Sequence, residues 1–305
     1  MPDEPALVTH GLGRDYGATC AVDELDLEVR AGEFFGFLGP NGAGKTTTIR
    51  MLTTLLRPTR GTAKVAGFDI EAAPLDVRRR IGVVFQETTL DLDLTAEENL
   101  RYCSRLYGLS RSESAERIDE ALALFGLEDR RHDRVRTFSG GMRRALDLAR
   151  GILHRPAILF LDEPTLGLDP VHRREIWAFL RRLCSESGTT MMLTTHYLQE
   201  ADPCDRVAIV DQGRIVTAGT PQELRRSLGR ESVELVTARP EEISARVEAL
   251  TGLVPQRDEH GLTVFTDDAG PVVEQLLPLR GEAVEIRVGR PSLEDVFVAV
   301  TRGRT

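Results

Sequence analysis

A glycine-rich segment that ends in a lysine and a threonine is the strongest chemical signal in this 305-residue chain. Residues 39–46 read GPNGAGKT and match the pattern G-x-x-x-x-G-K-[ST]. In such a loop, glycines let successive backbone N–H groups point at phosphate oxygens, and the lysine reaches the β- and γ-phosphates. The pattern therefore predicts a site for a nucleoside triphosphate. The residues expected to bind the nucleotide are Gly39, Asn41, Gly42, Gly44, Lys45, Thr46 and Thr47.

Lysine is rare in this sequence, which makes its position informative. Lys45 and Lys64 are the only lysines among 39 basic residues, and all the others are arginines. A planar guanidinium does not fit the niche between the phosphates, so Lys45 indicates a chemical requirement. The alternative, a glycine-rich turn with a solvated lysine, leaves this choice of residue unexplained. Thr46 carries a hydroxyl that is suited to binding Mg²⁺.

Two adjacent carboxylates end a second apolar run. Residues 156–164 read PAILFLDEP, which predicts a buried strand that finishes in Asp162 and Glu163. Side chains alternate along a strand, so the two carboxylates point in different directions. Asp162 is suited to binding Mg²⁺, and Glu163 is suited to polarising the attacking water as a general base. The alternative is an acidic strand end that caps the next helix.

A third motif lies between the first two. Residues 138–142 read FSGGM and open a helical run, and Ser139 precedes Asp162 by 23 positions. With the glycine loop before it and the acidic strand after it, this motif resembles the L-S-G-G-Q signature of ABC-transporter ATP-binding subunits. The resemblance covers about residues 5 to 230. In that family Ser139, Gly140 and Gly141 would complete the ATP site of a second copy, which implies a homodimer with two composite sites.

The resemblance also implies roles for four single residues. Tyr16 matches the aromatic residue that stacks on adenine, and Gln86 matches the glutamine that senses Mg²⁺ and the attacking water. Asp169 matches the aspartate that bridges the subunits, and His196 matches the switch histidine that contacts the γ-phosphate. Each has a plainer alternative: a packing tyrosine, a solvated glutamine, a helix-capping aspartate and a structural histidine. The implied catalytic residues are Glu163, His196 and Gln86, and the implied metal ligands are Thr46, Gln86 and Asp162.

Two features depart from the family pattern. Phe138 and Met142 stand where the signature usually has leucine and glutamine. Because the serine and glycines that would touch phosphate are intact, we still expect a working site. Residues 200–206 are one residue shorter than is usual after the switch histidine, and Pro203 forbids a regular helix there.

Strands and helices must position these motifs. A buried strand is expected at 32–38, before the glycine loop, and a helix at 47–56, after it. Thr95 and Glu98 read as a capping box that opens another helix. By resemblance, residues of about 87–150 form an α-helical subdomain that meets a membrane subunit. The predicted fold class is α/β, a P-loop NTPase core of the ABC ATPase type with this subdomain.

The pattern of elements changes near residue 230, so we expect a nucleotide-binding domain at 1–230 and a second domain at 231–305. The order β-α-β-β-α-β predicts a small α+β domain of ferredoxin-like type, followed by a last helix. Its ending, PSLEDVF at 291–297, resembles the tail of drug-export ATPases of the daunorubicin-resistance type. The expected elements are strands at 232–237, 253–257, 261–266 and 283–288 and helices at 240–251, 270–279 and 292–302.

Composition excludes several classes of function. A net charge of −9 argues against binding to nucleic acid, whose phosphates need a basic face. The four cysteines are scattered, which is not typical of a disulfide framework or a metal knuckle. No run approaches the ~18 apolar residues of a membrane span, and the acidic start lacks the features of a signal peptide. We expect a cytoplasmic protein that reaches the cytoplasmic face of the cell membrane through a partner.

The predicted function is an ATP-hydrolysing subunit that needs ATP and Mg²⁺, pairs with a second copy and powers export of a small molecule, such as a drug or lipid, through a separately encoded membrane permease. Three alternatives are an importer ATPase, an ABC protein of DNA repair or chromosome structure, and a ribosome-associated translation factor. DNA-repair proteins of this kind place long coiled coils between the phosphate loop and the signature. In this chain only 94 positions separate Lys45 from Ser139, which is too few for such an insertion. Translation factors of this kind usually carry two cassettes in one chain and basic segments.

Overall fold

The computed structural model describes residues 4–257, 261–279 and 285–302. The chain divides into two compact units, Met1–Thr217 and Ala218–Thr305. This division falls earlier than the boundary expected at 230/231, because helix α7 (Pro221–Arg226) packs against the last helix, α10 (Leu293–Arg302).

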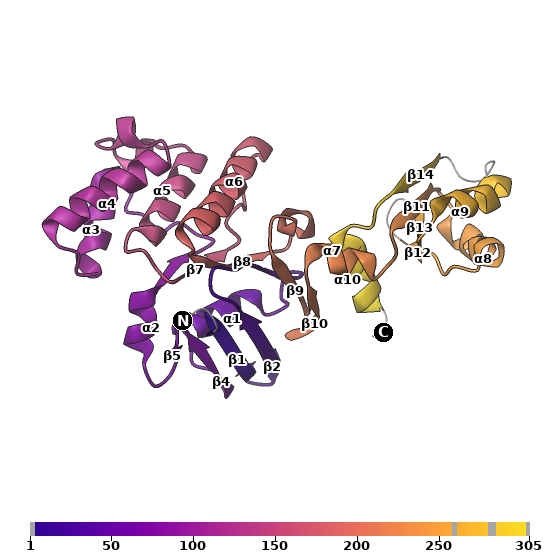
Figure 1. Cartoon of the computed structure of the whole chain (residues 1–305), viewed down its shortest axis with the longest axis horizontal. Helices are drawn as coiled ribbons and strands as arrows, with labels where there is room; N and C mark the ends of the chain where they lie inside the picture. Colours follow the sequence, from indigo (N-terminus) through magenta and orange to yellow (C-terminus); the bar gives the residue numbers. More distant parts are fainter. Residues whose placement is uncertain (1–3, 258–260, 280–284, 303–305) are drawn as a thin grey trace. The chain divides into compact units, whose positions relative to one another are not determined.

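A six-stranded sheet forms the centre of the first unit (Figure 1). Its strands, in spatial order, are β10 (Arg214–Gly219), β9 (Arg206–Asp211), β3 (Phe34–Leu38), β8 (Thr190–Thr195), β7 (Ile158–Asp162) and β6 (Ile81–Val84). From β9 to β6 all neighbours are parallel, so their carboxyl ends meet at one edge of the sheet. Ligands of parallel α/β sheets bind outside that edge.

An antiparallel sheet packs against the central sheet. It consists of β2 (Thr19–Val29), β1 (Leu7–Tyr16), β4 (Arg60–Val65) and β5 (Phe68–Asp69). Leu12 and Val65 from this sheet share one hydrophobic cluster with Phe37 and Phe160 of the central strands. The two sheets therefore enclose a common core.

Three helices form the expected α-helical part of the unit. They are α3 (Ala96–Leu106), α4 (Arg111–Leu124) and α5 (Gly140–Ile152), which lie together in Figure 1. Leu100, Ile118 and Leu146 bury against one another in a separate hydrophobic cluster. The predicted capping box of Thr95 and Glu98 opens α3.

The helix after the glycine loop is shorter than the sequence predicts. Helix α1 runs over Lys45–Leu52, whereas its apolar spacing suggested 47–56. Thr54 has a φ of 63°, in the left-handed region, and Leu55 is 59% exposed. The chain therefore turns away after Leu52 although the apolar spacing continues. The first unit also contains α2 (Pro74–Arg80) and α6 (Pro170–Ser187).

The second unit follows the predicted β-α-β-β-α-β order. Its sheet has the order β12-β13-β11-β14 with all neighbours antiparallel, which is the ferredoxin-like arrangement. Of the strand predicted at 253–257, only the last two residues form a strand in the structure. Of the strand predicted at 283–288, the first two residues lie outside the described part of the chain. Its elements are β11 (Glu231–Val236), α8 (Pro240–Thr251), β12 (Gln256–Arg257), β13 (Gly261–Thr266), α9 (Ala269–Leu276) and β14 (Glu285–Gly289).

Within the described ranges, every helix is too short or too polar to cross a lipid bilayer.

Replacement of Thr95 by alanine should lower the free energy of unfolding by about 1 kcal/mol, because α3 loses the side-chain acceptor at its first turn. In the native chain, Thr95 Oγ1 accepts from Glu98 N at 3.2 Å, and Glu98 Oε2 accepts from Thr95 N at 2.8 Å. Urea denaturation followed by circular dichroism measures the loss. Thr95→Asp keeps an acceptor and should remain near the wild type; an equal loss in both variants would rule out the cap as the cause.

Candidate nucleotide-binding site

A hollow of about 510 Å³ opens at the carboxyl edge of the central sheet. It lies where β3, β6, β7 and β8 end, so segments far apart in the sequence meet there. The sheet therefore brings most of the predicted loop and carboxylate residues into one place. The hollow is lined by Ala21, Asn41, Gly42, Gly44, Lys45, Thr46, Thr47, Gln86, Glu163, Leu166 and His196.

The glycine loop wraps around the ammonium group of Lys45. The Lys45 side chain is 5% exposed, and its Nζ donates to Gly39 O at 2.8 Å and to Pro40 O at 3.0 Å. Burial lowers the pKa of Lys45, and the carboxylates of Glu163 and Asp162 oppose that shift. Lys45 thus holds a charge inside the loop, balanced by backbone oxygens and these carboxylates.

Glycine is required at position 44 for two reasons. Its φ is 95°, a conformation that other residues rarely adopt, and a Cβ there would lie 2.4 Å from Ala21 O of strand β2. Gly42 also has a positive φ, of 83°. The loop can curl this tightly because both positions lack a side chain.

Asp162 ends β7 beneath the loop. Its side chain is 2% exposed and accepts from Thr194 Oγ1 at 2.6 Å, while Thr46 Oγ1 lies 3.4 Å from the same Oδ1. Hydroxyl and carboxylate oxygens are the ligand types that Mg²⁺ prefers. The chemistry of this donor pair therefore fits the metal expected from the sequence.

Glu163 stands on an unusual backbone conformation. Its φ is 47°, and its N–H donates to the carbonyl and to the hydroxyl of Thr194, each at 3.1 Å. A non-glycine residue with positive φ stores strain and is often found at functional sites. The turn presents Oε1 to the hollow, 3.0 Å from His196 Nδ1 and 3.8 Å from Lys45 Nζ. The general-base candidate therefore contacts both the histidine and the lysine of the site.

Two further predicted residues have exposed side chains. Gln86 follows β6 and lines the hollow. Tyr16 ends β1, is 45% exposed and does not line the hollow; its ring lies 4.9 Å from the guanidinium carbon of Arg14. The tyrosine is thus accessible for stacking on a flat ligand.

The signature residues lie outside the hollow. Ser139 caps α5 and accepts from Met142 N at 3.2 Å, and Gly140 and Gly141 begin that helix. A Cβ on Gly141 would lie 2.8 Å from the ring of His172, so this glycine allows close packing. The structure therefore does not bring the signature to the phosphate loop of its own chain.

Asp169 caps α6 and accepts from Val171 N at 3.0 Å and His172 N at 3.2 Å. Its other carboxylate oxygen pairs with His172 Nδ1. The bond from His172 lowers the pKa of Asp169 to about 2, and the same contact raises the pKa of His172. Asp169 does not line the hollow, and within one chain its contacts are those of a helix cap.

The segment with Pro203 forms no α-helix, as the proline predicts. A short 3-10 turn over Leu198–Ala201 leads into it. The Pro203 carbonyl accepts from Arg181 Nη1 at 2.8 Å, and Asp205 Oδ2 accepts from Phe34 N at 2.9 Å. The shortened segment is therefore anchored to α6 and β3.

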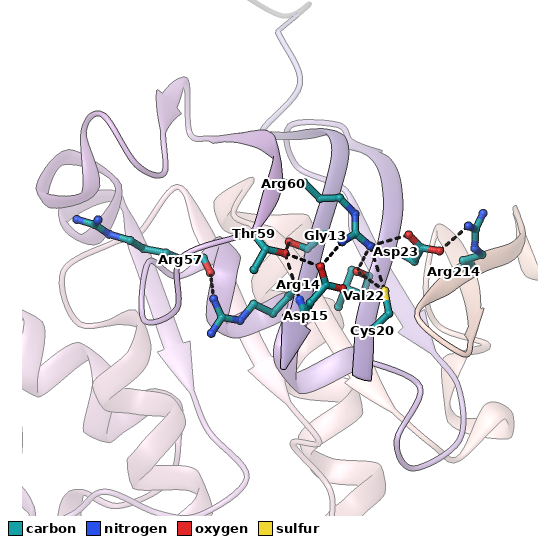
Figure 2. Close-up of polar contacts among 10 residues, drawn as sticks. All are labelled: Gly13, Arg14, Asp15, Cys20, Val22, Asp23, Arg57, Thr59, Arg60 and Arg214. Carbon is teal, nitrogen blue, oxygen red and sulfur yellow. Dashed lines mark hydrogen bonds and ion pairs between the residues drawn. The ribbon is translucent and has the colours of Figure 1, made fainter. Parts of the chain in front are cut away.

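A polar cluster fixes the antiparallel sheet beside the loop (Figure 2). The Arg60 guanidinium of β4 contacts Asp15 of β1, and Cys20 and Asp23 of β2; Asp23 also pairs with Arg214 of β10. At the β9–β10 turn, Gly213 N donates to Ala43 O of the loop at 3.2 Å and Gly213 O accepts from Asp23 N at 2.9 Å. This cluster therefore reaches the glycine loop through the turn.

Thr194 and His172 contact the predicted set but were not predicted from the sequence. Thr194 binds both Asp162 and the backbone of Glu163, and His172 lies between Asp169 and Gly141. A polar residue near the end of an apolar strand was the available signal for Thr194. For His172 the available signal was its position three residues after the capping aspartate.

Comparisons with known proteins agree with this geometry. A family model described as ABC transporter matches residues 22–166, and one described as the C-terminal domain of DrrA1-3-like ATP-binding proteins matches residues 219–301. The chain is 46% identical over 308 residues to the daunorubicin/doxorubicin resistance ATP-binding protein DrrA of Streptomyces peucetius, covering 97% of this chain and 92% of that protein. It is 42% identical over 289 residues to the Nod factor export ATP-binding protein I of Cupriavidus metallidurans, covering 94% of each.

A solved structure has the same cassette. The dimeric, post-hydrolysis state of the ATP-binding cassette MJ0796 bound to ADP and Pi superposes with a TM-score of 0.64 at 26% identity. The match covers 70% of this chain and 98% of that one. Together with the two family models and the full-length relatives, this likeness confirms the resemblance drawn from the three motifs. The chain belongs to the ATP-binding subunits of ABC transporters, which are ATPases, and carries the C-terminal domain of the DrrA-like group.

Proposed function

We propose that two copies of this chain bind and hydrolyse ATP between them and thereby power export of a small molecule through a separate membrane permease. The observation that carries the proposal is the hollow in which Lys45, Glu163 and His196 converge while Ser139 lies outside it. One chain supplies the phosphate loop and the base, but not the signature group for the same site. A second copy is the natural source of that group.

The predicted residues in and beside the hollow have separate tasks. Lys45 and the loop N–H groups bind the β- and γ-phosphates of ATP. Glu163 accepts a proton from the attacking water, and His196, 3.0 Å from its carboxylate, orients that carboxylate and contacts the γ-phosphate. Tyr16 stacks on the adenine.

Thr46, Asp162 and Gln86 are the residues that would hold Mg²⁺. The first two place oxygens 3.4 Å apart beneath the loop, and Gln86 lines the hollow. When bound, the metal neutralises charge on the phosphates during transfer.

Pairing follows from where the signature lies. Ser139 and the N-terminus of α5 form an exposed group that can bind a phosphate of ATP held by the other copy. Asp169, on the exposed start of α6, bridges the two copies in this arrangement. ATP that contacts both copies stabilises the closed pair, because it binds that state more tightly than the open one. The solved relative bound to ADP and Pi is itself a dimer, which supports this proposal.

Export is supported by the whole-length relatives. Those described above are named for resistance to daunorubicin and doxorubicin and for export of Nod factor. We infer that the cargo is a small molecule and that the chain is held at the cytoplasmic face of the membrane by the permease. The direct experiment is expression of the chain with its membrane partner, followed by efflux of doxorubicin from loaded cells with and without ATP depletion.

Lys45→Ala should lower kcat for ATP hydrolysis by ~10²-fold or more, because a preorganised charge at the phosphates is lost. The sequence offers a matched control, since Lys64 is the only other lysine and is exposed on β4. Lys64→Ala should hydrolyse ATP like the wild type. Phosphate release by the purified proteins measures both, and full turnover by Lys45→Ala would exclude the phosphate-loop assignment.

Glu163→Gln should still bind ATP but hydrolyse it at least 10²-fold more slowly, because the amide cannot accept the proton from water. ATP should then hold the pair closed, and size-exclusion chromatography with MgATP should show a stable dimer. Glu28→Gln, at an exposed position of β2, should behave like the wild type. A monomeric Glu163→Gln protein at saturating ATP, or one with normal turnover, would contradict this assignment.

A further inference from the structure

A buried charged cluster lies on helix α5, behind the catalytic segments. Arg144 is 8% exposed, and Asp147 is fully buried. Asp147 forms ion pairs with Arg150 Nη2 at 2.7 Å and with Arg144 Nη1 at 3.7 Å. Burial raises the pKa of Asp147 and lowers that of Arg144, and the opposite charges counteract both shifts. The two arginines therefore share one carboxylate inside the protein.

The guanidinium of Arg144 binds the backbone of both catalytic segments. Its Nη1 donates to Phe85 O at 2.6 Å, directly before Gln86. Its Nε donates to Pro164 O at 2.7 Å, and its Nη2 donates to Glu163 O at 3.3 Å. A single side chain thus holds the residue before Gln86 and the backbone of the general base.

Arg150 lies further along α5 and holds the other end of the Gln86 segment. It donates to Thr89 O at 3.1 Å and contacts the Thr89 hydroxyl. Residues 85–89 are therefore bound at both ends by arginines that a single carboxylate, Asp147, connects.

Simple packing does not account for this arrangement. Burying an ion pair costs several kcal/mol of hydration, and an apolar residue of similar volume is often at least as stabilising. The carbonyls that Arg144 binds belong to segments that leave their strands, where the regular ladder of backbone hydrogen bonds has ended. A planar fork of donors suits several carbonyls at once, whereas a lysine offers one compact group.

We propose that Arg144 is a positioning residue for ATP hydrolysis, which fixes the backbone of Gln86 and Glu163 to the helix that Ser139 caps. The inference rests on the proposed function, because it assigns Ser139 to the ATP site of the second copy. Engagement of that ATP moves or orders α5, and Arg144 transmits the change to the base of its own chain. The cluster thereby couples the two composite sites of the pair.

The test compares three full-length variants in one hydrolysis assay. Arg144→Met keeps most of the apolar volume but removes all three donors. Arg144→Lys keeps the charge beside Asp147, which protects folding. Arg143→Met is the matched control: Arg143 is the neighbour on the same helix, and it donates to Val135 O and Arg136 O, away from the catalytic segments. For each protein, kcat, KM for ATP and thermal stability are measured.

We expect Arg144→Met to lose at least ten-fold in kcat with a KM within two-fold of the wild type, Arg144→Lys to fall between, and Arg143→Met to keep its kcat. A purely structural role would lower thermal stability and leave kcat of the folded protein unchanged. Wild-type kcat in folded Arg144→Lys, or equal kcat in Arg144→Met and Arg143→Met, overturns the inference and leaves the proposed function standing. A wild-type protein without turnover overturns both.

Discussion

The site depends on one constraint: the carboxyl ends of parallel strands meet at one edge of a buried sheet. Strands β3, β7 and β8 are buried along their whole length, so they cannot shift without loss of close packing. The residues that follow β7 and β8, Glu163 and His196, therefore meet at 3.0 Å although 33 positions separate them. The same edge sets Lys45 Nζ 3.8 Å from Glu163.

Buried charge explains how the irregular segments keep their shape. Lys45 is surrounded by loop carbonyls, and Arg144 binds the carbonyls of the segments behind the site. Each cation loses hydration when it is buried, and hydrogen bonds to backbone oxygens that the sheet does not use offset this loss. In both places, the group that carries charge also fixes the backbone. The geometry of the candidate site and the shape of these segments thus depend on the same contacts.

The predictable parts of this protein are those with a local signal. The glycine loop and the acidic strand end could be predicted because a few adjacent residues define their geometry. The end of α1 could not, since Leu55 continues the helical spacing while Thr54 adopts a left-handed conformation. The hydrogen bonds of Thr194 to Asp162 and of Arg144 to Phe85 also could not be predicted from the sequence. They span 32 and 59 positions, and only the folded sheet brings those residues together.

The central claim is that one ATP site is built from two copies, and complementation between two inactive variants tests it most directly. Ser139→Arg blocks the signature and leaves the phosphate loop, whereas Lys45→Ala disables the loop and leaves the signature. Each variant alone should be inactive. Half of the pairs in an equal mixture contain one intact site, and the chain that supplies its phosphate loop carries the blocked signature, so that chain receives no signal through Arg144. The account therefore predicts that activity reappears at no more than about a quarter of the wild-type rate. A mixture that remains as inactive as its components, or full activity of Ser139→Arg alone, would contradict it.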